Sequence, residues 1–439
     1  MGIKVVKFGG SSLADAERFR TVKSIVESDP DRKFVVPSAP GKRFKTDEKV
    51  TDLLYQCYNA VSRSMSMEEP FDKIRARYTE IKEELGMDYD LEGMLIETHD
   101  LMLENVTPDY FASRGEYMNG RLLAAYLGWD FIDPAGFIKF DRHGTFASEW
   151  TNETLAEELE KHERAVIPGF YGSFPNGEVR TFPRGGSDIT GAVVSRAAGA
   201  DVYENWTDVS GFLMADPRIV DNPKGIDVLT YRELRELSYM GATVLQEDAI
   251  FPVHRAGIPT NIRNTYQPDH PGTMIVSDAK GFPAKYPITG VAGKRDFTLI
   301  SIVKDMMNAE LGFGRRVLQA AEELGISFEH LPTGIDTMCI TIASSELDKK
   351  LNQLINRISE LCQPDSIEVF QGMSLIATVG RGMVSTPGNA AKIFTALYNA
   401  GVNVRMIDQG SSELNIIVGV GNADFEKATA AIYNAFVEE

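Results

Sequence analysis

The first dozen residues constrain the fold most strongly. Residues 3–8 (IKVVKF) are a short apolar run with two valines and an isoleucine, typical of a strand buried on both faces of a parallel sheet. Gly9 and Gly10 break this run, because glycine bends tightly at little cost. Ser12, with Asp15 three residues later, predicts a helix start with a capping box. A strand, a glycine turn and a helix N-terminus together form an anion site.

Lys7 stands at the end of this predicted strand, where a charged group needs a partner. A nucleotide phosphate would supply one. The alternative is an ordinary strand-to-helix turn whose lysine extends to solvent.

Composition limits the class of protein. The 439 residues predict two or three domains, and 43% hydrophobic with 25% charged residues fits a large core. A net charge of −18 argues against a nucleic-acid partner, and anionic substrates would need local cations. Cys57, Cys339 and Cys362 show no CxxC spacing, and no apolar run reaches membrane-span length. We therefore expect a cytoplasmic protein with free thiols and no membrane association.

Further strands and helices alternate along the first 276 residues. Residues 33–39 form a predicted strand that ends in small residues, and Thr51 or Asp52 caps a helix that opens at residue 50. Residues 55–105 predict peripheral helices. Residues 113–127 predict a helix with Glu116 in its first turn, where the helix dipole alone would favour a carboxylate. The alternation predicts an α/β domain with a largely parallel sheet, followed by a linker at 277–287.

A second informative stretch covers residues 181–190. Gly185 and Gly186 let the backbone approach a ligand closely, and Arg184 can bind a carboxylate through two hydrogen bonds. Asp188 opens a predicted helix, either as a simple N-cap or as a carboxylate that faces a metal. Arg218 lies in a predicted turn, where it could reach a phosphate or remain a solvated loop residue.

The last third of the chain contains an internal repeat. Three glycines recur at a constant offset of 76 positions (388 − 312, 401 − 325, 410 − 334), and apolar positions follow the same offset. Each copy predicts a βαββα unit that buries one sheet face against two helices. Two copies indicate paired domains and not a solenoid. The pair is either a dimerisation scaffold or a sensor of a small ligand.

Four stretches in this order resemble the signatures of aspartate kinases: KFGGSS at 7–12, SRGE at 113–116, RGGSD at 184–188 and WTDVSG at 206–211. The repeat resembles the tandem ACT domains of the same family, with STPG at 385–388 and QGSSELN at 409–415 in the second unit. The resemblance implies an amino-acid-kinase αβα sandwich with a largely parallel sheet over residues 1–285. Two ferredoxin-like ACT domains over 286–439 follow. The first, about 297–370, is inserted into the second, about 288–292 plus 371–439.

The resemblance also implies an activity. It is the transfer of the ATP γ-phosphoryl group, with Mg²⁺, to the side-chain carboxylate of L-aspartate, giving 4-phospho-L-aspartate, the first step of lysine, threonine and methionine biosynthesis. Lys7 and Asp188 would be catalytic, with Asp188 organising either Lys7 or Mg²⁺, which itself would be held with ATP and not by direct protein ligands. The implied ATP-binding residues are Lys7, Gly9, Gly10, Ser11, Thr207, Asp208 and Arg218. The implied aspartate-binding residues are Ser38, Thr51, Glu116, Arg184, Gly185, Gly186 and Ser187.

The chemistry fits this set of residues. A carboxylate nucleophile is already ionised at neutral pH, so it needs no general base. Catalysis can then rest on alignment and on neutralising charge.

Regulation is implied as well. Lysine, or threonine in second place, would bind Met307, Gly312, Phe313 and Glu329, and the chain would form a homodimer through its ACT domains, or a tetramer. Glu329 could pair with an effector ammonium or be a plain surface charge. The alternatives are a glutamate or N-acetylglutamate kinase, or a non-catalytic amino-acid sensor, against which the set Lys7, Glu116, Arg184 and Asp188 argues.

Two positions depart from the family pattern. Gln246-Glu247-Asp248 replaces the usual residues of a helix, and Tyr266 stands where many relatives place a lysine, so neither is assigned a role. No GxGxxG dinucleotide fingerprint occurs, so we expect a monofunctional enzyme without a fused dehydrogenase.

Overall fold

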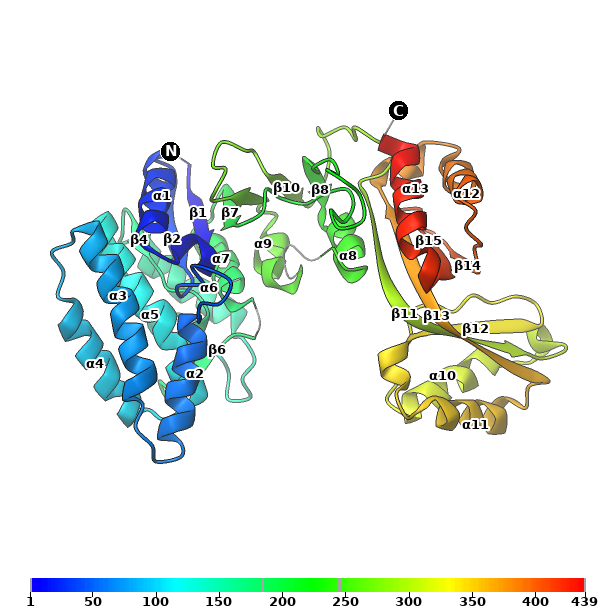
Figure 1. The fold of residues 1–439 in the computed structure, drawn as a ribbon, viewed down its shortest axis with the longest axis horizontal. Helices are drawn as coiled ribbons and strands as arrows, with labels where there is room; N and C mark the ends of the chain where they lie inside the picture. Colours follow the sequence, from blue (N-terminus) through cyan, green and yellow to red (C-terminus); the bar gives the residue numbers. More distant parts are fainter. Residues whose placement is uncertain (1, 184, 243–246, 438–439) are drawn as a thin grey trace. The chain divides into compact units, whose positions relative to one another are not determined.

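The computed structural model describes residues 2–183, 185–242 and 247–437. Its contacts divide the chain into two units (Figure 1). The first unit contains Met1–Phe212, Asp227–Tyr231 and Val244–Lys280. The second contains Gly281–Glu439 together with Leu213–Ile226 and Arg232–Thr243, two segments that fall inside the predicted catalytic domain.

The first unit is built on an eight-stranded sheet of order β3-β4-β2-β1-β7-β9-β10-β8. Neighbouring strands are parallel, except for the antiparallel pair β9–β10. This confirms the predicted α/β class and its largely parallel sheet. The strands are β1 (Lys4–Phe8), β2 (Arg32–Pro37), β3 (Asp130–Phe131), β4 (Ala165–Val166), β7 (Val202–Thr207), β8 (Val228–Thr230), β9 (Thr260–Asn264) and β10 (Thr273–Val276). A separate hairpin joins β5 (Tyr171–Ser173) and β6 (Val179–Thr181).

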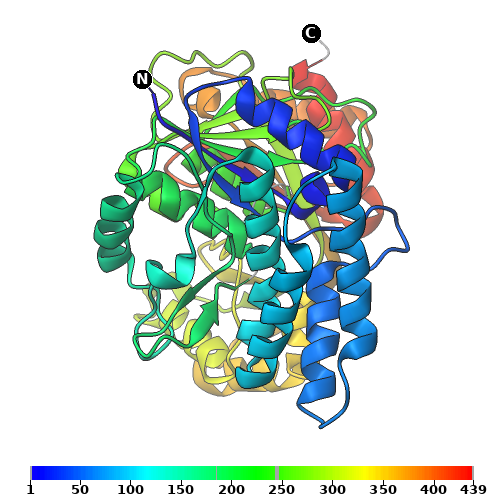
Figure 2. The same cartoon turned by 90° about the vertical axis from the view of Figure 1, so that its left-hand side faces the viewer.

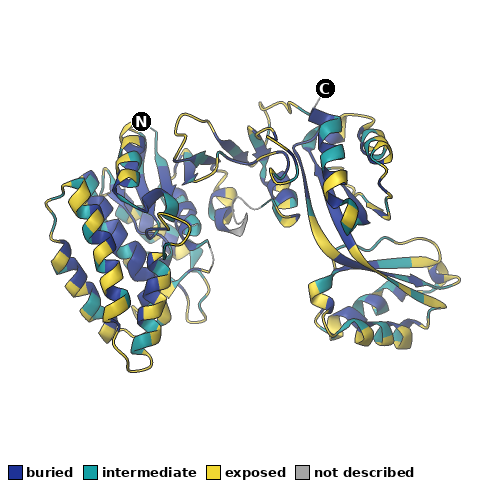
Figure 3. Ribbon diagram, in the orientation of Figure 1, coloured by how far each residue is buried: buried dark blue, intermediate teal, exposed yellow. Residues whose placement is uncertain are grey.

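Helices cover both faces of this sheet. Alternate residues of β1 belong to different cores: Val6 packs with α1 and α2–α5, whereas Val5 packs with α6 and α7. Helices α2 to α5 lie side by side as a bundle (Figure 2). The strands between the two helix layers are buried (Figure 3). The helices are α1 (Ala16–Glu27), α2 (Val50–Val61), α3 (Glu68–Leu85), α4 (Leu91–Glu104), α5 (Pro108–Leu127), α6 (Ser148–Leu159), α7 (Gly186–Ala197) and α9 (Phe251–Ala256), with 3-10 turns η1 (Gly10–Leu13), η2 (Pro134–Gly136) and η3 (Glu247–Ile250).

The first helix does not begin where the sequence predicts. Asp15 is the N-cap of α1 and accepts a hydrogen bond from the Arg18 backbone at 3.0 Å. Ser12 lies in η1, and its hydroxyl bonds to the Thr265 hydroxyl at 2.7 Å. The predicted role of Ser12 as a cap is therefore wrong, because its hydroxyl is committed to a tertiary contact.

Two further helix starts are also corrected. Lys49 is the N-cap of α2, so Thr51 and Asp52 lie within its first turn. Helix α5 begins at Pro108 behind a Thr107 cap, which places Glu116 in the middle of the helix and not in its first turn. The segment with Gln246-Glu247-Asp248 is only partly within the described residues, where η3 is followed by α9.

The second unit contains one antiparallel five-stranded sheet of order β12-β11-β13-β15-β14. Two long strands run through both halves of the repeat: Gly290–Lys294 of β11 pair with residues 375–379 of β13, and Phe297–Val303 pair with residues 366–373. Gly312 and Gly388 occupy equivalent N-caps, with φ of 78° and 89°. The strands are β11 (Gly290–Val303), β12 (Thr337–Ala343), β13 (Ser366–Val379), β14 (Met406–Asp408) and β15 (Asn415–Gly421), and the helices are α10 (Phe313–Glu323), α11 (Leu351–Cys362), α12 (Asn389–Asn399) and α13 (Phe425–Val437).

Helix α8 (Tyr231–Tyr239) explains why Arg232–Thr243 belong to this unit. The fully buried Glu233 accepts hydrogen bonds from the Thr289 hydroxyl and, at 3.0 Å, from the Arg381 guanidinium. Glu236 accepts one from Asn415 at 2.6 Å. No described helix is long and apolar enough to span a membrane.

The two equivalent glycine caps yield a stability test. Gly388→Ala places a Cβ on a backbone with φ of 89°, and should lower the free energy of unfolding by about 1–2 kcal/mol. Gly421→Ala is the matched control, because Gly421 also has open space around it but a φ of −67°. Urea unfolding of the full chain measures both variants. Equal stability of the two would contradict the assigned backbone conformation.

Candidate active site

Lys7 is nearly buried at the end of β1. Its Nζ lies 2.6 Å from Oδ1 of Asp188 on α7. The same oxygen accepts a hydrogen bond at 2.9 Å from Asn205, which is opposite Lys7 in the β1–β7 register. A lysine with a side chain only 9% exposed requires such a carboxylate, so strand β1, strand β7 and helix α7 meet at one charged group.

The glycine turn after β1 is held from three sides. The Gly9 amide donates to the Trp206 carbonyl at 3.0 Å, and the Gly41 amide donates to the Gly10 carbonyl at 2.8 Å. A Cβ on Gly10 would stand 2.8 Å from the Ala39 carbonyl oxygen, so only glycine fits. The Tyr266 hydroxyl donates to the Ser11 carbonyl at 3.2 Å, and the Arg18 guanidinium lies over the Tyr266 ring.

Helix α7 begins with the glycines predicted to line the substrate pocket. Gly185 is its N-cap with a φ of 81°, a backbone conformation that glycine adopts without strain. Gly186 lies so close to the Phe170 ring that a Cβ would be 2.5 Å from it. Ser187 follows and is buried. Arg184, the predicted ligand of the α-carboxylate, lies outside the described residues.

Glu116 is buried on α5. Burial raises the pKa of its carboxyl to about 8. The backbone of Ala39 and of Glu116 itself, together with the positive charges of Lys7 and Arg114, lowers this pKa but does not offset the effect of burial. Its Oε2 atom is buried and has no hydrogen-bond partner in the described part of the chain. Ser38 follows β2, and its carbonyl accepts a hydrogen bond from Asn119 of α5 at 2.6 Å.

The predicted nucleotide-binding residues are divided between the two units. Thr207 ends β7, and its hydroxyl donates to Asp208 at 3.2 Å. Arg218 pairs with Asp216 at 2.6 Å, its side chain is 85% exposed, and it belongs to the second unit. Because β1, β2 and β7 are parallel, their carboxyl ends share one edge of the sheet. That edge contains Lys7, Gly9, Gly10, Ser11, Ser38, Thr207, Asp208 and Asp188.

Asn205 and Thr265 were missed from the sequence, and Tyr266 was singled out without a role. Asn205 holds Asp188, and Thr265 and Tyr266 hold the glycine turn. Asn205 lies next to Glu204 in β7 (VYENWT), so its polar side chain does not stand out in the sequence. Nothing in the sequence near Thr265 indicates its partner, since Ser12 is 253 positions away.

Asp188 also fits a magnesium-linked role. Lys7 and Asn205 both bind Oδ1 of Asp188, and no side chain in the described ranges forms a hydrogen bond or ion pair with Oδ2. The described ranges contain no group of three or more His, Cys, Asp or Glu able to hold a metal alone.

Three of the predicted effector residues, Met307, Gly312 and Phe313, lie at or just before the start of α10, whereas Glu329 follows the end of that helix and its amide donates to the Thr341 carbonyl. Met307 and Phe313 are buried in the core of the first repeat half, whereas Gly312 is the N-cap of α10. Glu329 accepts a hydrogen bond from the Tyr239 hydroxyl. Partial burial and this bond together raise the pKa of Tyr239 to about 12.

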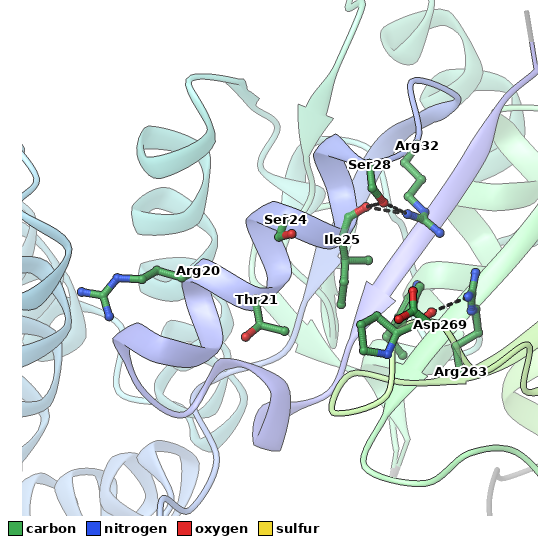
Figure 4. A pocket seen from close by; sticks show the side chains of 10 residues that line it. Arg20, Thr21, Ser24, Ile25, Ser28, Arg32, Arg263 and Asp269 are labelled. Atoms are coloured by element: carbon green, nitrogen blue, oxygen red, sulfur yellow. Dashed lines mark hydrogen bonds between the residues drawn. The ribbon is translucent and has the colours of Figure 1, made fainter.

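A cavity of about 650 Å³ beside α1 contains none of the predicted site residues (Figure 4). Its guanidinium groups are already engaged: Arg32 binds Glu204 at 2.9 Å, and Arg263 donates to the Pro268 carbonyl at 2.6 Å. We therefore assign this cavity a structural role and keep the strand ends as the candidate active site.

An αβα sandwich with a lysine and a glycine turn at the carboxyl end of its first strand defines the class of amino acid kinases. The sequence profile of the amino acid kinase family matches residues 2–264, and that of an ACT domain matches residues 376–436. Aspartokinase 3 of Bacillus subtilis is 39% identical to this chain over 449 residues, which cover 99% of this chain and 98% of the Bacillus subtilis protein. The chain belongs to the aspartokinase family, whose members are kinases that phosphorylate aspartate.

Solved structures agree. The crystal structure of Clostridium acetobutylicum aspartate kinase, described as an allosteric enzyme, is 52% identical, with a TM-score of 0.91 and complete coverage of both chains. Escherichia coli aspartokinase III in complex with aspartate and ADP is 26% identical, with a TM-score of 0.72 and complete coverage of both chains. A second structure of that enzyme contains lysine and aspartate.

The buried carboxyl of Glu116 makes stability depend on pH. Between about pH 4.5 and 8 the unfolded chain has released this proton and the folded chain retains it. The free energy of unfolding therefore falls by up to about 1.4 kcal/mol for each pH unit in this range. Glu116→Gln removes this loss. We expect its free energy of unfolding to exceed that of the unmutated chain by an amount that grows from pH 5 to pH 8, measured by urea unfolding. A constant difference across this range would contradict the raised pKa.

Proposed function

We propose that the chain transfers the γ-phosphoryl group of ATP to the side-chain carboxylate of L-aspartate, yielding 4-phospho-L-aspartate, as the first step of lysine, threonine and methionine biosynthesis in the cytoplasm. The observation that carries this proposal is the Lys7–Asp188 ion pair next to the glycine turn at the carboxyl end of β1. The complex of Escherichia coli aspartokinase III with aspartate and ADP supports both substrates.

Each residue of the sheet edge has a role in this proposal. Lys7 neutralises phosphate charge, and Gly9, Gly10 and Ser11 offer backbone amides to the phosphates. Glu116 receives the substrate ammonium, whose charge would favour the ionised carboxylate despite its burial. Arg184 binds the α-carboxylate, with Ser38, Thr51, Gly185, Gly186 and Ser187 around the substrate and Thr207, Asp208 and Arg218 on the nucleotide side.

The reaction needs no protein base, since the attacking carboxylate is ionised at neutral pH. Magnesium, held by the ATP phosphates and reached by Asp188, would neutralise charge on the transferred group. Asp188 thereby organises both Lys7 and magnesium, because Oδ1 pairs with Lys7 and Oδ2 is left for the metal. The chain's contribution is alignment of two anions in a strongly acidic protein.

Regulation by lysine through the ACT region is part of the proposal, with threonine as the second candidate. Glu329 supplies a carboxylate for the side-chain ammonium of lysine, and the lysine complex of the Escherichia coli enzyme supports this choice. Exposed apolar side chains of the second unit, Leu311 (94%) and Tyr398 (81%), support a homodimer through the ACT domains.

Substitution of Lys7 tests the phosphate role. Lys7→Ala should lower kcat at least about 100-fold, because the variant lacks the positive charge that stabilises the transferred phosphoryl group. Lys4→Ala is the control on the same strand, since Lys4 pairs with Asp29 at 2.7 Å and not with Asp188. ADP formation with aspartate measures both, and near-normal turnover of Lys7→Ala refutes the assignment.

Substitution of Glu329 tests the effector. Glu329→Gln should raise the lysine concentration for half-inhibition roughly 10- to 100-fold, because a charge-assisted hydrogen bond is lost. Glu322→Gln, an exposed charge on α10, is the control. Unchanged lysine inhibition, or inhibition by threonine alone, would remove Glu329 from the lysine site.

A comparison of acceptors tests the substrate. Initial rates with aspartate, glutamate and N-acetylglutamate should show turnover with aspartate only. Turnover with glutamate alone would end the proposal, and binding of lysine without any turnover would favour a non-catalytic sensor.

A further inference from the structure

Helix α5 presents two buried acceptor oxygens one turn apart. Glu116 and Asn119 are 6% and 0% exposed, and a spacing of three residues places them on the same side of the helix. Oε2 of Glu116 and Oδ1 of Asn119 are both buried, and neither has a hydrogen-bond partner within the described ranges.

Both side chains bind the same short segment after β2. The Asn119 amide Nδ2 donates to the Ser38 carbonyl at 2.6 Å, and the backbone of the next residue, Ala39, lies near enough to the Glu116 carboxyl to lower its pKa. These contacts bring the two side chains to one place at the carboxyl edge of the sheet.

The orientation of the Asn119 amide follows from its partner. A flipped amide would set its oxygen against the Ser38 carbonyl oxygen, so the nitrogen faces Ser38 and the oxygen is left over. Buried polar oxygens are normally satisfied, so two such oxygens on one helical turn call for a partner that the described residues do not supply. A bound cation would favour the ionised form of Glu116, in which both oxygens are acceptors.

Among the described residues, the polar groups near this position are already engaged. Lys7 is engaged with Asp188, and the Arg114 guanidinium donates to Ser113 and lies over the rings of Tyr110 and Tyr117. The Tyr78 hydroxyl donates to the Gly115 carbonyl at 2.9 Å.

We propose that Asn119 is a further substrate-binding residue, whose side-chain carbonyl receives the α-ammonium of the amino-acid substrate together with Glu116. The inference rests on the proposed function and adds a ligand to the same pocket. An ammonium has three N–H donors and can serve both oxygens at once. Because the second acceptor is a neutral amide, the pocket balances one positive charge without burying a second negative one.

Kinetics of Asn119→Ala and Asn119→Ser test this assignment. Loss of a hydrogen bond to a charged group should raise the KM for aspartate roughly 10- to 100-fold. The KM for ATP and kcat should change less than about 3-fold. Asn152→Ala is the matched control, because its Oδ1 is also buried without a partner in the described chain but lies on α6; its aspartate KM should not change.

Succinate separates the two roles of Asn119. It keeps both carboxylates of aspartate and lacks the ammonium, so its inhibition constant should stay within about 3-fold in both variants. A matching rise for succinate would show that Asn119 acts only by holding Ser38, and would overturn the proposal, as would an unchanged KM for aspartate.

Two further results keep the test decisive. If Asn119→Ala does not fold, as judged by circular dichroism, Asn119→Ser alone decides the question, since it retains a small polar side chain. If the unmutated enzyme shows no aspartate-dependent ADP formation, the proposed function fails first and this inference fails with it.

Discussion

The ion pair between Lys7 and Asp188 is the contact on which the rest of the site depends. It joins the first strand of the sheet to the helix whose glycine-rich start lines the predicted substrate pocket. Removing one partner would leave the other buried without compensation, at a cost of about 3–5 kcal/mol. Asn205 adds a neutral donor to the same oxygen, so the carboxylate is fixed without a second cation. In a chain of net charge −18, this arrangement keeps a positive group where two anions must meet.

The regulatory unit is organised by a different constraint, the sharing of two long strands. Strands β11 and β13 each contribute to both halves of the repeat, so neither half has a complete sheet alone. Helix α8 is fastened to this unit through Glu233 and Glu236, although it follows β8 of the first unit in the chain. The Tyr239 hydroxyl at the end of α8 reaches Glu329, the residue to which we assign the effector ammonium. A ligand at Glu329 would compete with this bond.

Local sequence patterns predicted the helices and strands, but they did not predict the contacts between residues that are far apart in the sequence. The apolar run before Gly9 predicted β1, and the offset of 76 predicted equivalent glycine caps at Gly312 and Gly388. Ser12 was misread because its hydroxyl bonds to Thr265, 253 positions away, and not to its own helix. The helix that contains Glu116 was predicted to begin at residue 113, whereas α5 begins at Pro108 behind the Thr107 cap, which was overlooked. Asn119 and Asn205 carry no motif, and their importance appears only when their partners are in place.

A crystal structure with aspartate, magnesium and a non-hydrolysable ATP analogue tests the central claim most directly. The terminal phosphates should lie within hydrogen-bond distance of Lys7 and of the amides after β1, with the aspartate carboxylate directed at them from the start of α7. Phosphates bound elsewhere, with the strand end and the start of α7 both empty, would contradict it.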